Sequence, residues 1–159
     1  MEEDGGLTKA IAGVDSLRRK SEMRFIVACG TTDGDSLTDD HFGESEHFYI
    51  FHLDDFDAEL VKKVRNTSRE EIEDVTHDDP HKAREVSEIL AEEAVNVILA
   101  RKMGPNIVRI SKKFVPVIFR GKSIDNGLNV LADNLHLVGR EWRKGKKREY
   151  LVLKRPDKD

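Results

Sequence analysis

The sequence predicts an α/β domain built on a mixed five-stranded sheet, and two features of the chain carry this prediction. Three consecutive segments with the character of strands, Phe25–Cys29, His47–Leu53 and Glu59–Arg65, have no helical pattern between them, which favours antiparallel pairing. In the second half, apolar segments at residues 95–100 and 115–119 alternate with helical patterns, which favours parallel pairing. A sheet with both kinds of pairing, covered by helices, accounts for the whole pattern.

The first three strands are predicted from their composition and their boundaries. Phe25–Cys29 is an apolar run that ends at Gly30, as is typical of a buried strand. His47–Leu53 is rich in aromatic residues, and Asp54-Asp55 marks a turn after it. Glu59–Arg65 is therefore expected to pair back on the second strand.

Three helices are predicted to cover the sheet. The first runs from about His81 to Ala94, the second starts at Gly104-Pro105, and the third follows the N-cap Ser123. Their core-facing residues recur at helical spacing, and these are Ala83, Val86, Leu90 and Ala94, then Ile107, Ile110 and Phe114, then Ile124, Leu128 and Leu131. The resulting order, β-β-β-α-β-α-β-α, is that of the ribonuclease H-like three-layer fold.

The length suits one domain with extensions on both sides. The chain has 159 residues, of which 38% are hydrophobic and 36% are charged. Since this hydrophobic share is low for a chain that is globular throughout, part of the length is expected to be solvated. We expect an N-terminal extension at residues 1–22, an α/β domain at 23–134 and a basic C-terminal extension at 135–159.

Each extension has a pattern of its own. Ile11, Val14 and Leu17 indicate a weak helix before the basic run 18–20, in a segment that either orders on contact or stays disordered. Trp142 and Tyr150–Leu153 could pack as a further strand. The basic residues of the C-terminal extension form either a solvated tail or a docking surface for an acidic partner or nucleic acid, and they are Arg140, Arg143, Lys144, Lys146, Lys147, Arg148, Lys154 and Arg155.

Charge and cysteine content argue against several classes of protein. A net charge of −4 gives no overall bias toward nucleic acid or anionic membranes. The single cysteine, Cys29, excludes an intramolecular disulfide framework and a four-thiolate iron–sulfur site within one chain. No apolar run approaches the roughly 18 residues of a membrane helix, and the acidic residues 2–4 argue against a secretory signal. We expect a cytoplasmic protein without membrane contact.

Three segments together resemble a known family. A polar loop, residues 33–43, closes in His41-Phe42-Gly43 before the aromatic strand, a later strand leads through Arg101-Lys102 to Gly104-Pro105, and residues 114–119 form a last strand. In order and spacing they resemble the dinitrogenase iron–molybdenum cofactor accessory family, which includes cofactor carrier and insertion proteins and their archaeal relatives. The resemblance covers about residues 23–134. It departs from the family at Arg101-Lys102, where the loop is usually small and glycine-rich.

The resemblance implies non-catalytic binding or carriage of a metal cluster, for cofactor biosynthesis or delivery. The cluster would be an iron–molybdenum cofactor or a related iron–sulfur or molybdenum cluster, and the protein partner a cluster-synthesis or acceptor protein. Loops as long as residues 31–46 are usually functional or disordered in compact domains. This loop holds the candidate cofactor-binding residues Asp33, Gly34, His41, Phe42 and Gly43.

Three side chains are candidate metal ligands. His41 is the first because imidazole suits iron; alternatively it caps the loop through backbone hydrogen bonds while Phe42 anchors it. His81 is the second, because it would lie close to His41 if the first helix begins beside the loop. Alternatively, this segment only starts the helix, with Asp78 or Asp79 as its N-cap. Cys29 is the third because a thiolate suits an iron–sulfur core, although a cysteine at a strand end is more often a small buried hydrophobe.

Arg101, Lys102, Gly104 and Pro105 complete the candidate cofactor-binding residues. A helix that starts at Gly104-Pro105 presents free N–H groups and partial positive charge. Together with the two cations beside it, such a helix start suits an anionic cluster. The alternative is ordinary capping with two exposed cations.

Two other classes of function compete with the carrier. A metal-dependent nuclease on the ribonuclease H-like fold needs clustered carboxylates, one of them in the first strand, and residues 24–29 contain none. A nucleic-acid or protein docking module would use the basic C-terminal residues. No complete Gly-x-x-x-x-Gly-Lys-Ser/Thr phosphate loop and no Gly-x-Ser-x-Gly elbow occur in the chain, so we do not expect an enzyme.

Overall fold

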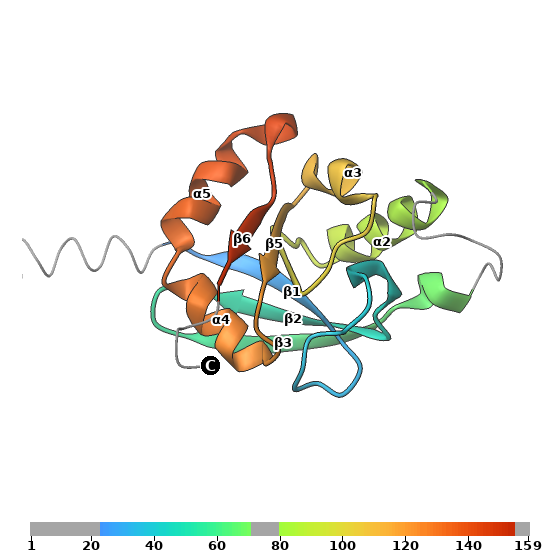
Figure 1. The fold of residues 1–159 in the computed structure, drawn as a ribbon, viewed down its shortest axis with the longest axis horizontal. Helices are drawn as coiled ribbons and strands as arrows, with labels where there is room; N and C mark the ends of the chain where they lie inside the picture. The colour runs from blue at the N-terminus through green and yellow to red at the C-terminus, as the bar shows by residue number, and fades with distance from the viewer. Residues whose placement is uncertain (1–22, 71–79, 155–159) are drawn as a thin grey trace, which may run out of the picture.

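The computed structural model describes residues 23–70 and 80–154 (Figure 1). The predicted extension at residues 1–22 lies outside the described residues, as do residues 71–79 and 155–159. The strands are β1 (Phe25–Thr31), β2 (His47–Leu53), β3 (Ala58–Arg65), β4 (Val97–Ala100), β5 (Val115–Phe119) and β6 (Leu151–Leu153). The α-helices are α2 (Pro80–Glu92), α3 (Ile107–Ser111), α4 (Ile124–Ala132) and α5 (Leu135–Arg143), and short 3-10 helices occur at η1 (Phe42–Glu44), η2 (Thr67–Glu70) and η3 (Gly145–Lys147).

The strands form one mixed sheet in the order β3-β2-β1-β4-β5-β6. β1 is antiparallel to β2 and β2 to β3, whereas β4, β5 and β6 continue the sheet in parallel from β1. The predicted mixture of antiparallel and parallel pairing is therefore confirmed. The predicted number of five strands is wrong, because residues 151–153 pair with β5 and make a six-stranded sheet within the described residues.

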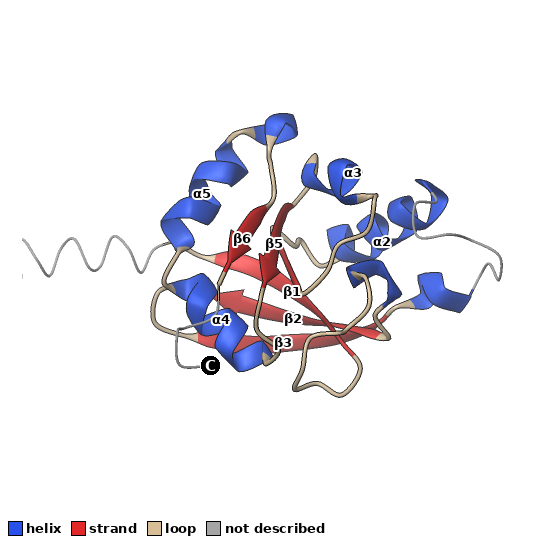
Figure 2. Cartoon of the chain, in the orientation of Figure 1, coloured by secondary structure: helices blue, strands red, loops and turns tan. Residues whose placement is uncertain are grey.

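Helices lie on both sides of the sheet and give the domain three layers (Figure 2). Val86 and Leu90 of α2 and Ile110 of α3 pack on one face of the sheet. On the other face, α4 and α5 contribute Leu128, Leu131 and Val138, among other residues. None of the described helices is long and apolar enough to cross a membrane.

The second predicted helix begins later than the sequence suggested. Gly104-Pro105 lies in the turn before α3, which starts only at Ile107 and has five residues. The N–H of Ile110 makes the first helical bond, 3.0 Å to the carbonyl oxygen of Asn106. A residue before proline avoids helical geometry, so Gly104 belongs to the connection from β4. The expected helix N-terminus at Gly104-Pro105 is therefore corrected.

Residues beyond 134 take part in the fold. In α5, Leu135 and Val138 are buried, and Trp142 lies in this helix rather than in a strand. The guanidinium carbon of Arg148 lies 4.1 Å from the centroid of the Trp142 ring, and its Nη1 donates to the backbone oxygen of Lys112 at 3.0 Å. At least one of the basic residues expected in a solvated tail thus holds the C-terminal segment against the domain.

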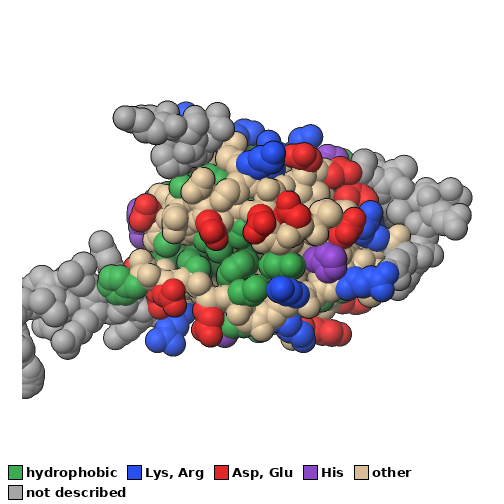
Figure 3. All heavy atoms as spheres, turned by 90° about the horizontal axis from the view of Figure 1, so that it is seen from below, with side chains coloured by type: hydrophobic (Ala, Val, Ile, Leu, Met, Phe, Trp, Pro, Cys, Tyr) green, Lys and Arg blue, Asp and Glu red, His purple; other side chains and the backbone are tan. Residues whose placement is uncertain are grey.

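The strand β3 forms an exposed edge of the sheet. Leu60 and Val61 are each 42% exposed, and most of the other side chains of β3 are exposed as well. Figure 3 views the molecule from this side and shows hydrophobic side chains exposed among acidic ones. The cationic side chains of Lys62, Lys63 and Arg65 on the same strand are of the kind that protects sheet edges against pairing with other chains.

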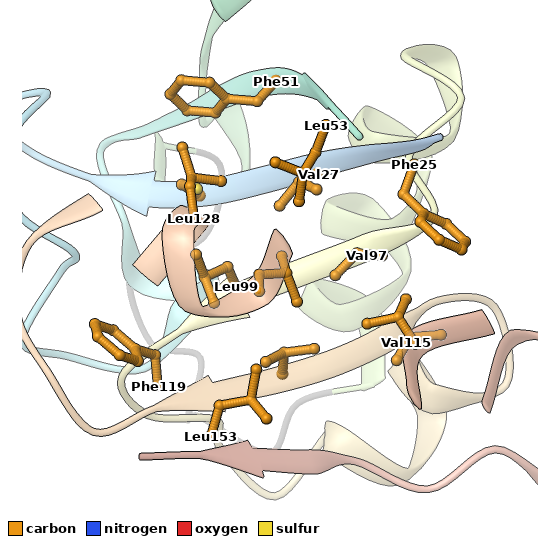
Figure 4. Close-up of a cluster of buried hydrophobic side chains, with 14 of the residues drawn as sticks. Phe25, Val27, Phe51, Leu53, Val97, Leu99, Val115, Phe119, Leu128 and Leu153 are labelled. Atoms are coloured by element: carbon orange, nitrogen blue, oxygen red, sulfur yellow. The ribbon is translucent and has the colours of Figure 1, made fainter. Parts of the chain in front are cut away.

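Two apolar clusters fill the space between the sheet and the helices. The larger cluster, which we call the α4/α5 core, joins residues of β1, β4 and β5 such as Val27, Leu99 and Phe119 to Leu128 of α4 (Figure 4). The smaller cluster, the α2/α3 core, contains Phe42 and residues of β2 and α2. Successive residues of a strand point to opposite faces, so β1 sends Val27 and Cys29 into the first cluster and Ala28 into the second.

Candidate functional site

The carboxyl ends of β1 and β4 lie side by side, because the two strands are parallel neighbours. The loop after β1 ends in His41-Phe42-Gly43, and the loop after β4 runs from Arg101 to Asn106. The N–H of Phe42 donates to the carbonyl oxygen of Lys102 at 3.1 Å, and Arg101 forms an ion pair with Asp39. The loop that ends in His41-Phe42-Gly43 and the loop after β4 are therefore in direct contact, although they are far apart in the sequence. We call these two loops the loop pair.

The His41 ring packs directly on Gly104. A methyl group on Gly104 would lie 2.9 Å from Nδ1 of His41 and 3.4 Å from its Cγ. Only a residue without a side chain leaves room for the ring at this distance. The structure thus gives Gly104 a role that the sequence did not suggest: its lack of a side chain allows the His41 ring to pack against the second loop.

Phe42 anchors the first loop in the α2/α3 core. Its side chain is 1% exposed, and its ring stacks on Phe48 with centroids 4.8 Å apart. The hydroxyl of Ser45 donates to the carbonyl oxygen of Phe42 at 2.7 Å. A methyl group on Gly30 would lie 2.1 Å from Oγ of Ser45, so β1 and the loop are in close contact. The predicted anchoring role of Phe42 agrees with this geometry.

Asn66 holds the same loop in place through buried hydrogen bonds. It is 1% exposed, and its side-chain amide donates to the carbonyl oxygens of Gly43 and Ser45, each at 2.8 Å. Its Oδ1 accepts the hydroxyl proton of Ser68 at 2.6 Å. Buried polar groups that are fully bonded hold a single geometry, and the Asn66 network therefore keeps the position of η1 and of His41 defined.

Asp33 and Gly34 shape the outer part of the loop. The Asp33 carboxylate accepts the N–H groups of Asp35 and Ser36, each at 2.8 Å. These backbone hydrogen bonds, from Ser36 first and then Asp35, lower the pKa of Asp33 below its ordinary value of 3.8. Gly34 has φ +86°, a conformation that side chains rarely adopt, and it lies against the ring of Tyr49. Asp33 and Gly34 thus stabilise the conformation of a turn within this loop.

An acidic hollow lies on the outer side of this loop. It has a volume of about 450 Å³ and is lined by Asp33, Asp39, Asp40, Glu44 and Glu46, with Arg69 and Lys122 as cations. An anionic ligand would be repelled by this excess of carboxylates. Asp33, although predicted as a cofactor-binding residue, therefore faces the less suitable side of the loop for an anionic cluster.

The inner side of the loop pair encloses a small cavity. Its volume is about 30 Å³, and its lining includes His41, Phe42, Gly43, Lys82, Met103 and Gly104. The Lys82 side chain is 7% exposed, and its Nζ lies 2.7 Å from Oε2 of Glu44. Burial of a charge is tolerated when it is paired in this way. The cavity thus has an imidazole, a thioether and a buried ion pair at its wall.

Cys29 lies on the wrong face of the sheet to join His41. It is 0% exposed, belongs to the α4/α5 core and pairs in register with Tyr49 and Leu99. Burial raises the pKa of its thiol well above the ordinary value, so a thiolate is strongly disfavoured. The alternative of a small buried hydrophobe describes this position, and the structure does not bring Cys29 together with His41.

His81 begins near the cavity but turns away from it. It lies in the first turn of α2, its side chain is 48% exposed, and its Nε2 is 3.5 Å from Oε2 of Glu85. The cavity wall instead takes the next residues of α2, Lys82 and Ala83. The expected convergence of His81 with His41 on one cavity is not found.

Several contributors to the site were missed by sequence reasoning. Met103, Lys82, Glu44 and Asn66 line or support the cavity, yet each lies in a segment that looks like ordinary loop or helix. A sequence signal existed only for Met103, which stands directly before Gly104. Within residues 23–70 and 80–154, no group of three or more His, Cys, Asp or Glu side chains could hold a metal ion.

Fold and site together define an α/β domain in which the His41 loop and the Gly104 loop meet at the carboxyl edge of the sheet. The family model described as dinitrogenase iron-molybdenum cofactor matches residues 23–133, and the chain belongs to this family. No curated protein gives a significant match. A solved structure from Methanocaldococcus jannaschii, of a protein provisionally described as a dinitrogenase, aligns with a TM-score of 0.51 and 19% identity over 71% of this chain and 92% of that one. At this identity the likeness shows a shared fold.

Proposed function

We propose that this protein binds and carries an anionic metal cluster, an iron–molybdenum cofactor or a related iron–sulfur or molybdenum cluster, without catalysing a reaction. Its acceptor would be a protein that synthesises or receives the cluster, in the cytoplasm. Membership of the cofactor family supports the class of ligand. The observation that carries the proposal is the contact of His41 with Gly104, since it puts an imidazole where two ligand-suited loops meet.

The volume of the cavity decides where such a cargo would bind. A buried water needs roughly 10–15 Å³ on this measure, so a cavity of about 30 Å³ admits few waters. A cluster of several metal and sulfur atoms is far larger. It would therefore bind at the mouth of the cavity, on the surface of the loop pair, with His41 as its protein ligand.

The side chains around His41 suit this cargo chemically. Imidazole and thioether groups are ligands for iron and iron–sulfur centres, and His41 and Met103 supply them at the cavity wall. Arg101 and Lys102 add positive charge on the second loop. Arg101 is paired with Asp39, whose side chain is 82% exposed.

The ribonuclease H-like assignment belongs to the same proposal. The part of the sheet ordered β3-β2-β1-β4-β5 has the pairing expected for that layout. β1 of this chain contains no acidic residue, whereas a nuclease of this layout needs a carboxylate there. We therefore propose a ribonuclease H-like scaffold that has a binding function in place of the nuclease centre.

The test is an anaerobic titration of the purified protein with isolated iron–molybdenum cofactor, followed by optical and EPR spectra. We expect saturable binding by the wild type and weaker binding by His41→Ala. His136→Ala removes an exposed histidine on α5 and is the matched control; it should bind as the wild type does.

Two results would overturn the proposal in whole or in part. Absence of binding by the wild type, both to the cofactor and to an iron–sulfur precursor, would exclude the carrier function. Equal binding by the wild type and His41→Ala would exclude His41 as a ligand. Metal analysis of the protein as purified under anaerobic conditions is a rapid first measurement.

A further inference from the structure

A groove on the far side of the domain from the loop pair is much larger than the His41 cavity. It lies between α4 and the turn that joins β2 to β3, and its volume is about 580 Å³. Leu53, Leu128 and Ala132 line its apolar part, and Phe56 stands at its edge with 69% of its surface exposed. Asp125, Leu128 and Ala132 recur at helical spacing, so one side of α4 forms a wall of the groove.

Carboxylates surround this groove. Asp55 and Asp57 come from the turn, and Asp125 and Asp133 from α4 and its end. No lysine, arginine or histidine is among its lining residues. Oδ2 of Asp55 is buried and has no hydrogen-bond partner among the described residues. Because a buried carboxylate oxygen without a donor is costly, the groove is suited to a segment that combines apolar side chains with cations.

The chain carries a segment of this kind shortly before the first described residue. The described part begins at Met23, which packs against the α4/α5 core, and Phe25 pairs in register with Leu53 of the groove. Residues 11–20 contain three apolar residues at helical spacing followed by three consecutive cations, and these are Ile11, Val14, Leu17, Arg18, Arg19 and Lys20. Extended chain spans about 3.3–3.6 Å per residue, so Leu17 can reach roughly 20 Å from Met23.

We propose that the groove between α4 and the β2–β3 turn is the docking site of the chain's own residues 11–20. The apolar side chains of the segment cover Leu128 and Phe56, and the run of cations faces the four aspartates and supplies a donor to Asp55. This inference is independent of the proposed cluster binding, because the groove and the loop pair lie at different edges of the domain.

Spin labelling of the full-length protein tests the docking directly. Cys29 is 0% exposed, so in the folded protein a nitroxide reagent attaches only to an introduced cysteine. With Ser16→Cys labelled, we expect a strong loss of amide signal at Phe56 and at Asn129 to Asp133 in the NMR spectrum. The amides of Met103 and Val108, beside the loop pair, should keep their intensity.

Charge variants of the same labelled protein separate docking from random contact. Asp125→Asn combined with Asp133→Asn should restore most of the lost signal, and so should high salt. Glu88→Gln combined with Glu92→Gln changes the charge by the same amount on exposed positions of α2. This control pair should leave the signal loss at the groove unchanged.

Three results would contradict the proposal. Signal loss that is absent at the groove would exclude docking there, and equal loss over the whole surface would show a segment without a preferred site. A mixture of labelled protein with unlabelled, ¹⁵N-enriched protein distinguishes the third case. If groove signals are lost in that mixture at the same protein concentration, the segment of a second copy is the occupant and the intramolecular assignment is wrong.

Discussion

The two faces of the sheet differ in what fills them. On the α4/α5 side, β1, β4 and β5 present a continuous apolar cluster that includes Leu99 and Cys29 at 0% exposure. On the α2/α3 side the cluster is smaller. There the buried polar groups of Ser45, Asn66 and Lys82 lie next to Phe42 and a small cavity.

If the protein carries a cluster as proposed, this difference separates the residues that determine only stability from those that also determine ligand binding. A closely packed apolar face contributes stability through area removed from water, but it offers no group that recognises a ligand. Buried polar groups cost desolvation unless they are bonded, and Asn66 and Lys82 have these bonds around the His41 loop. Substitutions on the α4/α5 face should therefore change stability alone, whereas those at the loop pair should also change binding.

Leu99→Ala is the largest expected perturbation and addresses the α4/α5 face. Leu99 is fully buried in β4, and truncation of such a side chain costs about 2–5 kcal/mol in the free energy of unfolding. Urea unfolding measures this cost. Cluster affinity per folded molecule should be unchanged. A cost below about 1 kcal/mol, or a weaker affinity at full folding, would show that the two faces are not separate in this way.

Asn66→Ala should be the most disruptive polar substitution on the α2/α3 side. It removes the donors to Gly43 and Ser45 and the acceptor for Ser68, and each buried group left unbonded costs about 1–3 kcal/mol. We expect a total loss near the middle of that range or above it, and faster hydrogen exchange in residues 42–46. Asn129→Ala, at an exposed position of α4, is the control and should be nearly neutral. Unchanged exchange in η1 would contradict the role given to Asn66.

Gly104→Ala tests the contact on which the site depends. The new methyl group would lie 2.9 Å from the His41 ring, which must move, and overpacking of this kind costs about 1–3 kcal/mol. Cluster affinity should fall together with stability. Gly139→Ala, in α5 and away from the loop pair, is the control, because its methyl group would come no closer than 3.4 Å to a neighbouring atom. If both variants bind the cluster with equal affinity, the contact between His41 and Gly104 does not contribute to cluster binding.

Asp33→Asn should have the smallest effect, and it depends on pH. Backbone hydrogen bonds to the carboxylate lower the pKa of Asp33 in the folded protein. The stability it contributes is therefore complete above its ordinary value near 3.8 and is lost as the pH falls below that value. Acid unfolding followed by circular dichroism should show a shallower pH dependence below about pH 4 for the variant. Identical acid transitions would indicate that the turn does not depend on this charge.

Much of the fold follows from local patterns of the sequence. Strand segments such as Phe25–Cys29 and the apolar faces of α2 and α4 were predicted because side chains recur every two residues in a strand and about every 3.6 in a helix. The family was predicted for a related reason, since the His41 loop and the Gly104-Pro105 segment keep their order and spacing, and the match to residues 23–133 confirms it. The sixth strand was offered only as a possibility at Tyr150–Leu153 and was left out of the predicted sheet, because Leu151–Leu153 is short and its partner β5 lies far back in the sequence.

Contacts between segments that are distant in the sequence were decided only by the tertiary structure. The order of the strands brings the ends of β1 and β4 together, and no local pattern reveals that His41 then lies on Gly104 or that Lys82 reaches Glu44. The register of β1 decides that Cys29 points away from both. By itself the sequence determined the elements and the family of this protein. The assembled sheet determined which candidate residues share a site, because strands far apart in the chain become neighbours only when it forms.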